Sequence, residues 1–374
     1  MKITNLYIKN FKSIKEVSFE LKNLNVFAGM NGMGKSSVIQ TLLLLKQSED
    51  RIARGIVTLN KQAFVELGQA RDVLYQFAEE KKINFKIQTD IYKLDWNFDY
   101  SSDDDYLDEN IRGGVLKFNY QEIQKSFNLF SNNFQYLNAE RLSPKITYKT
   151  SSYYVNSIKQ LGNQGEFTAH YLNVHGNEKV KNKAFIHMKA KSNILLHQVD
   201  AWLSEISPGT KLNTTNIPGT DLVLLDFQFE TIRDYTNRFR PVNVGFGLSY
   251  VLPVIVALLT AEKDKLIIIE NPEAHLHPRG QAEMGKLIAL AAEAGAQLII
   301  ETHSDHLLNG IRVAVKEKIM SEQNVALFYF NRMNTEGGEQ YSQVTSIKID
   351  RNGEFSEYPK DFMDEWSNQL YKLI

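Results

Sequence analysis

The sequence predicts an α/β protein in which a mixed, largely parallel sheet carries a phosphate-binding loop. Residues 29–36 read Gly-Met-Asn-Gly-Met-Gly-Lys-Ser and match the pattern G-x-x-x-x-G-K-[ST] at every fixed position. From residue 241 onward, apolar runs of strand length alternate with helical patterns, as in a parallel sheet covered by helices on both faces. One of these runs ends in an acidic residue, Glu270. The three observations together predict a nucleotide-binding α/β domain.

The loop at residues 29–36 has the strand–loop–helix surroundings that its chemistry requires. An apolar run at residues 24–28 leads into it, and a helical pattern at residues 36–47 follows it. Glycines let backbone N–H groups point at phosphate oxygens, and the helix adds the positive end of its dipole. Lys35 can reach the β- and γ-phosphates, and the Ser36 hydroxyl can bind Mg²⁺. We expect nucleotide contacts from Gly29, Asn31, Gly32, Gly34, Lys35, Ser36 and Ser37.

Composition limits the class of protein. The 374 residues are 43% hydrophobic, which is enough for a sizeable core of one large domain or two. A formal charge of −1 excludes a globally basic nucleic-acid binder but leaves a local basic patch open. The absence of cysteine excludes disulfides, cysteine-zinc sites and thiol catalysis. No signal peptide and no apolar run of membrane-spanning length is evident, so we expect a soluble, cytoplasmic protein.

The periodicity of apolar residues predicts the elements in order. Strands are expected at residues 3–11, 17–28, 64–67, 83–99 (a pair with clear alternation), 266–269, 297–300 and 325–330. Helices are expected at residues 36–47, 192–206, 248–260, 280–294 and 305–317. Acidic residues 101–109 and Pro/Gly/Thr/Asn-rich residues 207–220 are expected to be loops.

A second set of polar residues is expected at the carboxyl edge of the parallel sheet. Glu270 follows a buried strand, and the ligand crevice of an open parallel sheet lies at that edge, so Glu270 can bind Mg²⁺ opposite Ser36. The alternative is a surface acid that ends a core strand. His303 follows the next strand and can contact the γ-phosphate, unless it simply caps the next helix. A metal cluster involving His275 and His277 is not expected, since His-x-His places the two rings on opposite faces of an extended segment.

A glycine-rich segment precedes the helix at residues 248–260. The N-terminus of a helix binds anions, and one nucleotide rarely needs two such sites from one chain. A second subunit could therefore use this segment on the γ-phosphate bound by the first. The alternative is that the glycines permit close helix packing. The residues concerned are Gly245, Gly247 and Ser249.

These motifs together resemble the ABC-type ATPase heads of the RecF, SMC and overcoming-lysogenization-defect families. Residues 8–14 (Ile-Lys-Asn-Phe-Lys-Ser-Ile) resemble their opening strand and turn, residues 270–278 their Walker B and D-loop, and residues 301–305 their switch-histidine segment. The resemblance implies an ABC-type P-loop head with an antiparallel β subdomain and a mainly helical insertion. It also implies a signature-motif role for residues 245–249 and a Q-loop role, with a contact to Mg²⁺, for Gln69.

The sequence is closer still to a bacterial AAA-labelled subgroup. Its members carry Tyr-Leu-Asn-Ala-Glu-Arg, here residues 136–141, and a C-terminal domain of unknown function like residues 353–373. Many relatives occur in anti-phage defence operons. The resemblance therefore implies ATP and Mg²⁺ as ligands, an ATP-dependent homodimer or higher oligomer, and a separate effector protein.

The chain departs from the ABC pattern in two ways. Asn271 stands where those ATPases have the catalytic glutamate, and an amide cannot accept a proton from water. Either Glu273 replaces it, or hydrolysis is slow and ATP binding acts as a clamp. About 45 residues follow the strand ending at Phe330, too few for the nuclease domain of the overcoming-lysogenization-defect proteins.

These features predict a nucleotide-binding core at residues 1–70 and 241–335, an insertion at 71–240 and an extension at 336–374. The predicted function is a slow, dimeric ATPase switch that regulates a separate nuclease or toxin, with catalytic roles for Lys35, Glu270, Glu273 and His303. The main alternative is a RecF-like DNA clamp, whereas a membrane-transporter subunit or a kinase fits the motifs less well. DNA contacts would come from Lys179, Lys181, Lys183, Lys189 and Lys191.

Overall fold

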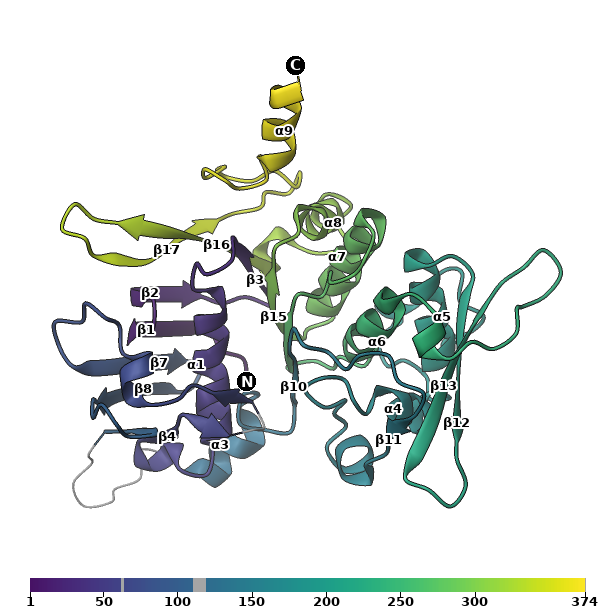
Figure 1. Ribbon diagram of the computed structural model, residues 1–374, viewed down its shortest axis with the longest axis horizontal. Coiled ribbons are helices and arrows are strands. Elements are labelled where there is room, and N and C mark those ends of the chain that lie inside the picture. The colour runs from purple at the N-terminus through teal and green to yellow at the C-terminus, as the bar shows by residue number, and fades with distance from the viewer. Residues whose placement is uncertain (62–63, 110–118, 374) are drawn as a thin grey trace. The chain divides into compact units, whose positions relative to one another are not determined.

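The computed structural model describes residues 1–61, 64–109 and 119–373, which form two compact units (Figure 1). The N-terminal unit contains residues 1–131, 325–348 and 355–374. The central unit contains residues 132–324 and 349–354. None of the described helices is long and apolar enough to span a bilayer.

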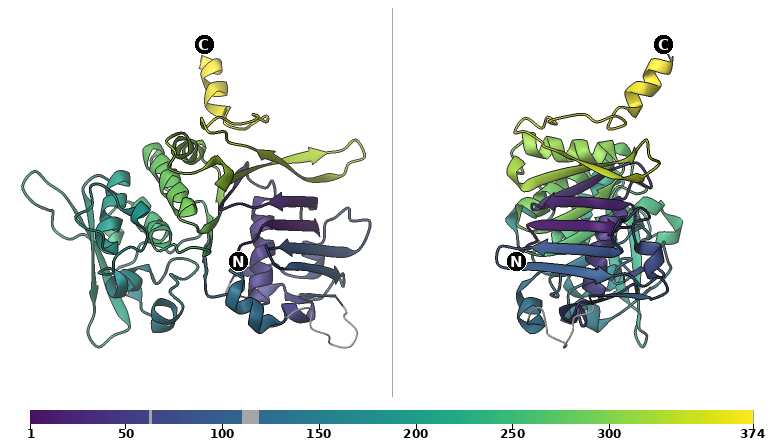
Figure 2. Two further views of the ribbon diagram at one scale, coloured as in Figure 1. Left: turned by 180° about the vertical axis from the view of Figure 1, so that it is seen from behind. Right: turned by 90° about the vertical axis from the view of Figure 1, so that its left-hand side faces the viewer.

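An antiparallel sheet forms one part of the N-terminal unit (Figure 2). Its strands alternate buried and exposed side chains, so one face lines the core. Two of them confirm the alternation predicted for residues 83–99. In spatial order the strands are β2 (Ile14–Glu20), β1 (Asn5–Phe11), β7 (Lys82–Gln88), β8 (Lys93–Asp99), β9 (Tyr106–Asp108) and β4 (Ile56–Thr58).

The P-loop strand of this unit has a different set of partners. Strand β3 (Leu24–Gly29) pairs in parallel with β16 (Val325–Asn334), which pairs antiparallel with β17 (Gln340–Ile347). The strand expected at residues 17–28 is therefore wrong as one element. Its halves belong to different sheets, because the Asn25 side chain hydrogen-bonds both the N–H and the carbonyl of Lys22 and so stabilises a turn.

The remaining elements of the N-terminal unit are short except for the helix after the P-loop. Helix α1 (Lys35–Gln47) is buried on nearly every side, as its broad apolar surface predicted. The others are η1 (Ile52–Arg54), β5 (Asn60–Lys61), β6 (Val65–Glu66), α2 (Ala70–Val73), α3 (Tyr120–Ser126) and α9 (Glu365–Leu373).

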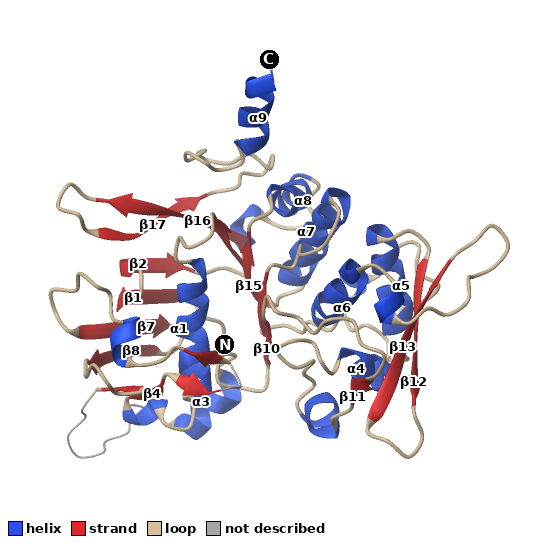
Figure 3. Cartoon of the chain, viewed as in Figure 1, coloured by secondary structure: helices blue, strands red, loops and turns tan. Residues whose placement is uncertain are grey.

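The central unit contains a parallel sheet with flanking helices (Figure 3). Strand β14 (Leu266–Glu270) pairs in parallel with β10 (Phe134–Leu137) and with β15 (Gln297–Thr302). Its Leu-Ile-Ile-Ile run is fully buried, which is typical of a parallel sheet covered on both faces. The helices are α4 (Thr168–His175), α5 (Leu195–Ile206), α6 (Phe246–Leu259), α7 (Pro278–Glu293) and α8 (Asp305–Lys316).

A second, antiparallel sheet in the central unit corrects one prediction. Strand β13 (Leu222–Phe229) pairs with β11 (Tyr148–Lys149) and with β12 (Thr210–Asn216). Residues 207–220 were expected to be a loop, but seven of them pair with β13 because backbone hydrogen bonds outweigh their polar composition. Single-turn elements complete the unit: η2 (Tyr153–Ser157), η3 (Lys183–Phe185), η4 (Pro241–Asn243) and η5 (Glu322–Asn324).

The compact units do not follow the domain ranges expected from the sequence. Strand β7 pairs with β1, so residues 82–88 belong to the same sheet as the N-terminal strand. Strand β17 pairs with β16, so part of the expected C-terminal extension joins the sheet that carries the P-loop strand. The assignment of residues 1–70 and 241–335 to one nucleotide-binding core remains a prediction.

Two glycines set the close crossing of helices α7 and α8. A Cβ atom on Gly310 would lie 2.1 Å from the Ala282 carbonyl oxygen, and one on Gly285 would lie 2.3 Å from that of Leu307. Gly310→Ala should therefore lower the free energy of unfolding by about 1–3 kcal/mol, because the helices must separate. Urea unfolding measures this. Gly337→Ala is the control, since its nearest neighbour would be 3.9 Å away. A stability of Gly310→Ala equal to wild type would contradict the close crossing.

Candidate nucleotide site

The P-loop in the N-terminal unit requires glycine at two positions. Gly29 has φ 138°, and a Cβ atom there would lie 2.4 Å from the Phe330 carbonyl oxygen on the neighbouring strand. Gly34 has φ 100° and caps helix α1, and a Cβ atom there would lie 2.2 Å from the Ser342 hydroxyl. Gly32 is also left-handed, with φ 73°, and its carbonyl accepts a hydrogen bond from Arg332. The backbone can therefore curl into the cradle that a phosphate needs.

Lys35 is held over this loop. The side chain is only 3% exposed, and its ammonium donates hydrogen bonds to the carbonyl oxygens of Gly29 (2.9 Å) and Met30 (2.7 Å). Ser36 and Asn31 are exposed and Ser37 is buried, all at or just before the N-terminus of a 13-residue helix. A buried cation, a glycine-built cradle and a helix N-terminus fit a nucleotide phosphate, and the exposed Ser36 hydroxyl fits a Mg²⁺ ligand.

Gln69 has local partners in the same unit. Its side-chain amide donates a hydrogen bond to the Asp103 carbonyl at 3.1 Å, and its backbone N–H donates to Asp72. The residue thus begins the short helix α2. Its predicted role at Mg²⁺ remains a prediction.

Glu270 ends the buried strand β14 in the central unit. Its carboxylate accepts hydrogen bonds from the Tyr136 hydroxyl at 2.9 Å and from the Ala139 N–H at 3.2 Å. Burial raises the pKa of Glu270, while these two hydrogen bonds and the nearby charge of Arg141 act in the opposite direction. The carboxylate is positioned by its neighbours, which suits a Mg²⁺ ligand better than an incidental surface acid.

Arg141 fixes the backbone around Glu270. It is 3% exposed, and its guanidinium donates to the carbonyl oxygens of Asn138 (3.2 Å), Glu270 (2.8 Å) and Asn271. The guanidinium carbon also lies 6.0 Å from the ring centre of Tyr250 on helix α6. Burial lowers the pKa of Arg141 to about 10, so the side chain stays charged at neutral pH.

The two residues at the centre of the hydrolysis question lie near Arg141, and Glu273 is buried whereas Asn271 is half-buried. Asn271 has φ 46°, a left-handed conformation that asparagine tolerates better than glutamate. Glu273 accepts a hydrogen bond from the His303 N–H at 2.9 Å, and its second oxygen is buried without a hydrogen-bond partner in the described chain. Burial raises the pKa of Glu273, opposed by the hydrogen bond from the His303 N–H and by the charge of Arg141.

The histidines divide into a site residue and a capping residue. The ring of His303 is exposed at the end of β15, next to the Glu273 contact of its own backbone. His277 caps helix α7: its ring nitrogen accepts from the Arg279 N–H at 3.3 Å, and Pro278 follows at the first helical position. His277 and Pro278 therefore begin helix α7.

The glycine-rich segment, residues 245–249, lies beside the turn at His275 that follows strand β14. Gly245 caps the 14-residue helix α6, and no atom would lie within 4 Å of a Cβ there. Gly247 is in close contact with the His275 backbone, because a Cβ would lie 2.6 Å from its carbonyl oxygen. Gly247 therefore supports the packing alternative, whereas the open Gly245 keeps the helix N-terminus accessible. Ser249 is buried in the first turns of α6.

The comparisons with known proteins decide the family. The family model described as "AAA domain, putative AbiEii toxin, Type IV TA system" matches residues 24–309. The chain belongs to this AAA-domain family. A second model, "Protein of unknown function (DUF3696)", matches residues 320–373 and confirms the predicted C-terminal domain of unknown function. No curated protein matched the chain.

Several solved structures are similar to this AAA-domain protein. They include an Smc head bound to the C-terminal winged-helix domain of ScpA, with 14% identity, 94% of this chain and 99% of that chain covered and a TM-score of 0.49. The SMC head domain from Thermotoga maritima has 11% identity, coverage of 92% and 99% and a TM-score of 0.44. An Smc head with an extended coiled coil, bound to a ScpA domain derived from Pyrococcus furiosus, has 14% identity, coverage of 100% and 99% and a TM-score of 0.47.

The structure of the AAA-domain protein groups the predicted site residues into two sets. The N-terminal unit holds the P-loop residues from Gly29 to Ser37, and the central unit brings together Glu270, Glu273, His303 and residues 245–249. Sequence reasoning gave no role to Arg141 and Tyr136. Their shared motif, residues 136–141, was visible as a subgroup marker, but no local pattern reveals that it contacts the turn after β14.

Proposed function

We propose that this protein is a Mg-ATP-dependent switch that hydrolyses ATP slowly. Lys35 would hold the β- and γ-phosphates, and the main-chain N–H groups of residues 29–34 would surround them. Ser36, Glu270 and Gln69 would hold a magnesium ion, which neutralises phosphate charge when bound. The observation that carries this proposal is the combination in one chain of a glycine-built loop over buried Lys35 with a desolvated, hydrogen-bonded Glu270.

Glu273 is the residue best suited to act as the general base. A base must be able to take a proton from water, and Asn271 cannot. One oxygen of Glu273 has no hydrogen-bond partner among the described residues, and burial raises its pKa above that of an ordinary glutamate. His303, whose backbone N–H holds the other Glu273 oxygen, would contact the γ-phosphate with its exposed ring.

Two chains would close around the nucleotides. The accessible helix N-terminus at Gly245 is a suitable site for the γ-phosphate held by another copy. ATP would favour the closed dimer only by its differential affinity for that state. The closed state would then control a separate effector in anti-phage defence. The family description, "AAA domain, putative AbiEii toxin, Type IV TA system", supports a role in a toxin–antitoxin system.

A RecF-like DNA clamp has weaker support. Of the five lysines expected to contact DNA, Lys181 forms an ion pair with Glu262, and Lys189 forms one with Glu205. These lysines are already partly neutralised by protein carboxylates, so the run is a weaker phosphate-binding surface than the sequence predicted.

The test combines Mg-ATP titration calorimetry with sedimentation velocity. Wild-type protein should bind Mg-ATP and dimerise in its presence, and Lys35→Ala should weaken binding about 10–100-fold. Because Ser249 is buried, the interface substitution is better placed at Gly245, which has open space around it. Gly245→Arg should abolish ATP-dependent dimerisation and keep the affinity of the monomer for ATP.

Ile232→Arg is the matched control for the interface variant, since Ile232 is a fully exposed apolar residue of the same unit. It should dimerise like wild type. A wild-type protein that stays monomeric at saturating Mg-ATP would contradict the switch. Loss of monomer affinity in Gly245→Arg would instead indicate that the segment binds a nucleotide of its own chain.

A further inference from the structure

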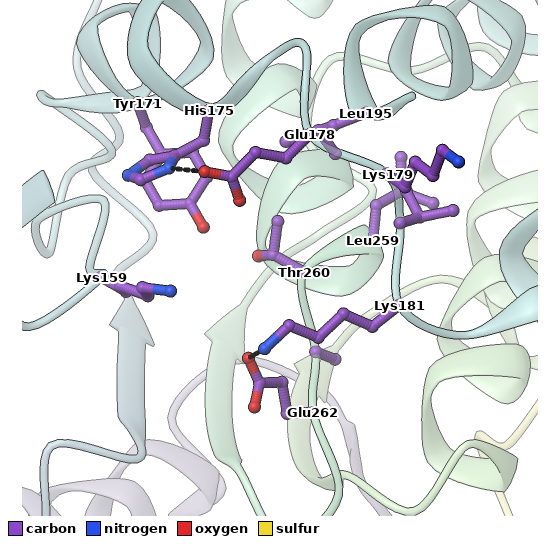
Figure 4. Close-up of a pocket in the computed structure, with 12 residues that line it drawn as sticks. Lys159, Tyr171, His175, Glu178, Lys179, Lys181, Leu195, Leu259, Thr260 and Glu262 are labelled. Carbon is purple, nitrogen blue, oxygen red and sulfur yellow. Dashed lines mark hydrogen bonds and ion pairs between the residues drawn. The ribbon is translucent and has the colours of Figure 1, made fainter. Parts of the chain in front are cut away.

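A pocket with a cavity volume of about 50 Å³ lies in the central unit at the C-terminal end of helix α6 (Figure 4). We call it the α6-end pocket. Helix α6 has 14 residues, so this end lies about 20 Å from the glycine-rich segment at its start. The residues that matter for its chemistry are Lys159, Tyr171, Glu178, Lys181, Leu259 and Glu262.

The acidic side chains of the α6-end pocket already have partners. Glu178 hydrogen-bonds the His175 ring at 2.7 Å, and Glu262 pairs with Lys181 at 2.5 Å. These contacts and the surrounding lysines keep the pKa of both carboxyls below the usual glutamate range. Lys159 has no hydrogen bond or ion pair within the described residues, and Figure 4 shows its ammonium directed into the pocket. The charge that remains to be matched is therefore positive.

The backbone at Lys159 presents this ammonium at a conformational cost. Lys159 has φ 51°, in the left-handed region that favours glycine or asparagine. It follows the π-helical turn η2 and is flanked by hydrogen bonds from Ile158 N–H to Tyr153 and from Gln160 N–H to Tyr154. A lysine at such a position is unfavourable for folding alone. Strained residues of this kind cluster at ligand sites.

A second lysine adds to the positive field. Lys265 is 7% exposed and has no hydrogen bond or ion pair of its side chain in the described chain. Burial, together with the charges of Lys159 and Lys181, lowers its pKa to about 8 against the attraction of Glu262. Together with Lys265, which does not itself line the pocket, Lys159 and Lys181 exceed Glu178 and Glu262 by one positive charge. This excess favours an anionic ligand.

We propose that the α6-end pocket binds a small phosphomonoester. Its phosphate would contact the Lys159 ammonium, beside the Tyr171 and Thr260 hydroxyls, and its organic part would pack on Leu195 and Leu259, which also line the pocket. The pocket is built from the central unit alone, whereas the P-loop belongs to the N-terminal unit. The proposal is therefore independent of the proposed ATP function.

The experiment uses the full chain with Lys35→Ala, so that the P-loop does not compete for phosphate. Phenyl phosphate is titrated by calorimetry and by ³¹P NMR, with phenol as the uncharged comparison. Phenyl phosphate should bind and phenol should not. Lys159→Gln should weaken binding at least about tenfold, the value expected for one charge-assisted contact. Lys179→Gln should change it less than about twofold, because Figure 4 shows the Lys179 ammonium pointing away from the other polar groups.

Lys159→Gly separates binding from folding. It removes the ammonium but suits the left-handed backbone, so the melting temperature should not fall while phenyl phosphate binding is lost. Equal binding by wild-type Lys159 and both Lys159 variants would overturn the proposal. So would the absence of phenyl phosphate binding in the Lys35→Ala protein, or equal binding of phenol.

Discussion

Replacing Glu273 with glutamine should reduce ATP turnover by about 10²–10⁴-fold and leave Mg-ATP binding nearly unchanged. The expectation rests on the second oxygen of Glu273, which is buried and has no hydrogen-bond partner in the part of the chain that the structure describes. Glutamine keeps the size of the side chain and one acceptor for the His303 N–H, but it cannot take a proton from water. Turnover of the variant is compared with wild type at saturating Mg-ATP, and affinity is measured separately by calorimetry.

The pH dependence of ATP turnover is a second test of Glu273 as the general base. Burial raises the pKa of Glu273, and a base is active only when it is ionised. Turnover should therefore fall as the pH is lowered through this raised pKa, at a higher pH than an ordinary glutamate would give. The acid limb should disappear from the residual activity of Glu273→Gln.

Two other glutamates make the result specific. Glu270→Gln should also lower turnover strongly, but through the loss of a Mg²⁺ ligand, so its residual turnover should depend differently on Mg²⁺ concentration. Glu140→Gln is the matched control, because Glu140 is exposed within residues 136–141, next to the site residue Arg141. It should retain wild-type turnover. Unchanged turnover in Glu273→Gln together with loss in Glu270→Gln would show that Glu273 is not the base.

The elements predicted correctly are those whose own apolar residues already indicate that they are buried. The apolar runs of β14, α1 and α6 are long and nearly continuous, and each was predicted to within about two residues. Strand β12 was missed because Thr-Lys-Leu-Asn-Thr-Thr-Asn contains one apolar residue, and only its pairing with β13 makes it a strand. Tertiary pairing decided what propensity could not.

The sequence likewise predicts only those parts of the candidate site that are contiguous in the chain. The P-loop is contiguous, so eight adjacent residues were enough to predict it and its glycine requirements. The support of Glu270 is not contiguous: Tyr136 and Arg141 precede it by more than 120 residues and meet it only because β10 pairs in parallel with β14. The left-handed backbone of Asn271 is also invisible in sequence, although it offers a physical reason for asparagine where ABC ATPases have glutamate.

Arg141→Met should lower the free energy of unfolding by about 3–5 kcal/mol, the cost of leaving buried charge without its partner. The guanidinium satisfies three carbonyl oxygens and supplies positive charge to both Glu270 and Glu273. Methionine can fill part of the volume, but it can neither hydrogen-bond the three carbonyl oxygens nor supply positive charge. Urea unfolding at neutral pH measures the loss. The free energy of unfolding of Arg141→Lys should lie between those of wild type and Arg141→Met. Lysine keeps the charge but lacks the planar fork that reaches several carbonyls.

Arg312→Met is the matched control for Arg141. Arg312 belongs to the same unit, and its guanidinium donates to the Gly353 carbonyl, Asn309 and Glu354, but it is more exposed and these three partners are not candidate site residues. Its loss should cost about 1–2 kcal/mol and leave turnover unchanged. Arg141→Met should also raise the pKa of Glu270 and Glu273, since the charge of Arg141 lowers both, and so move the acid limb of turnover to higher pH. Equal stability losses in the two variants, with no change in the pH profile, would mean that Arg141 only fills space.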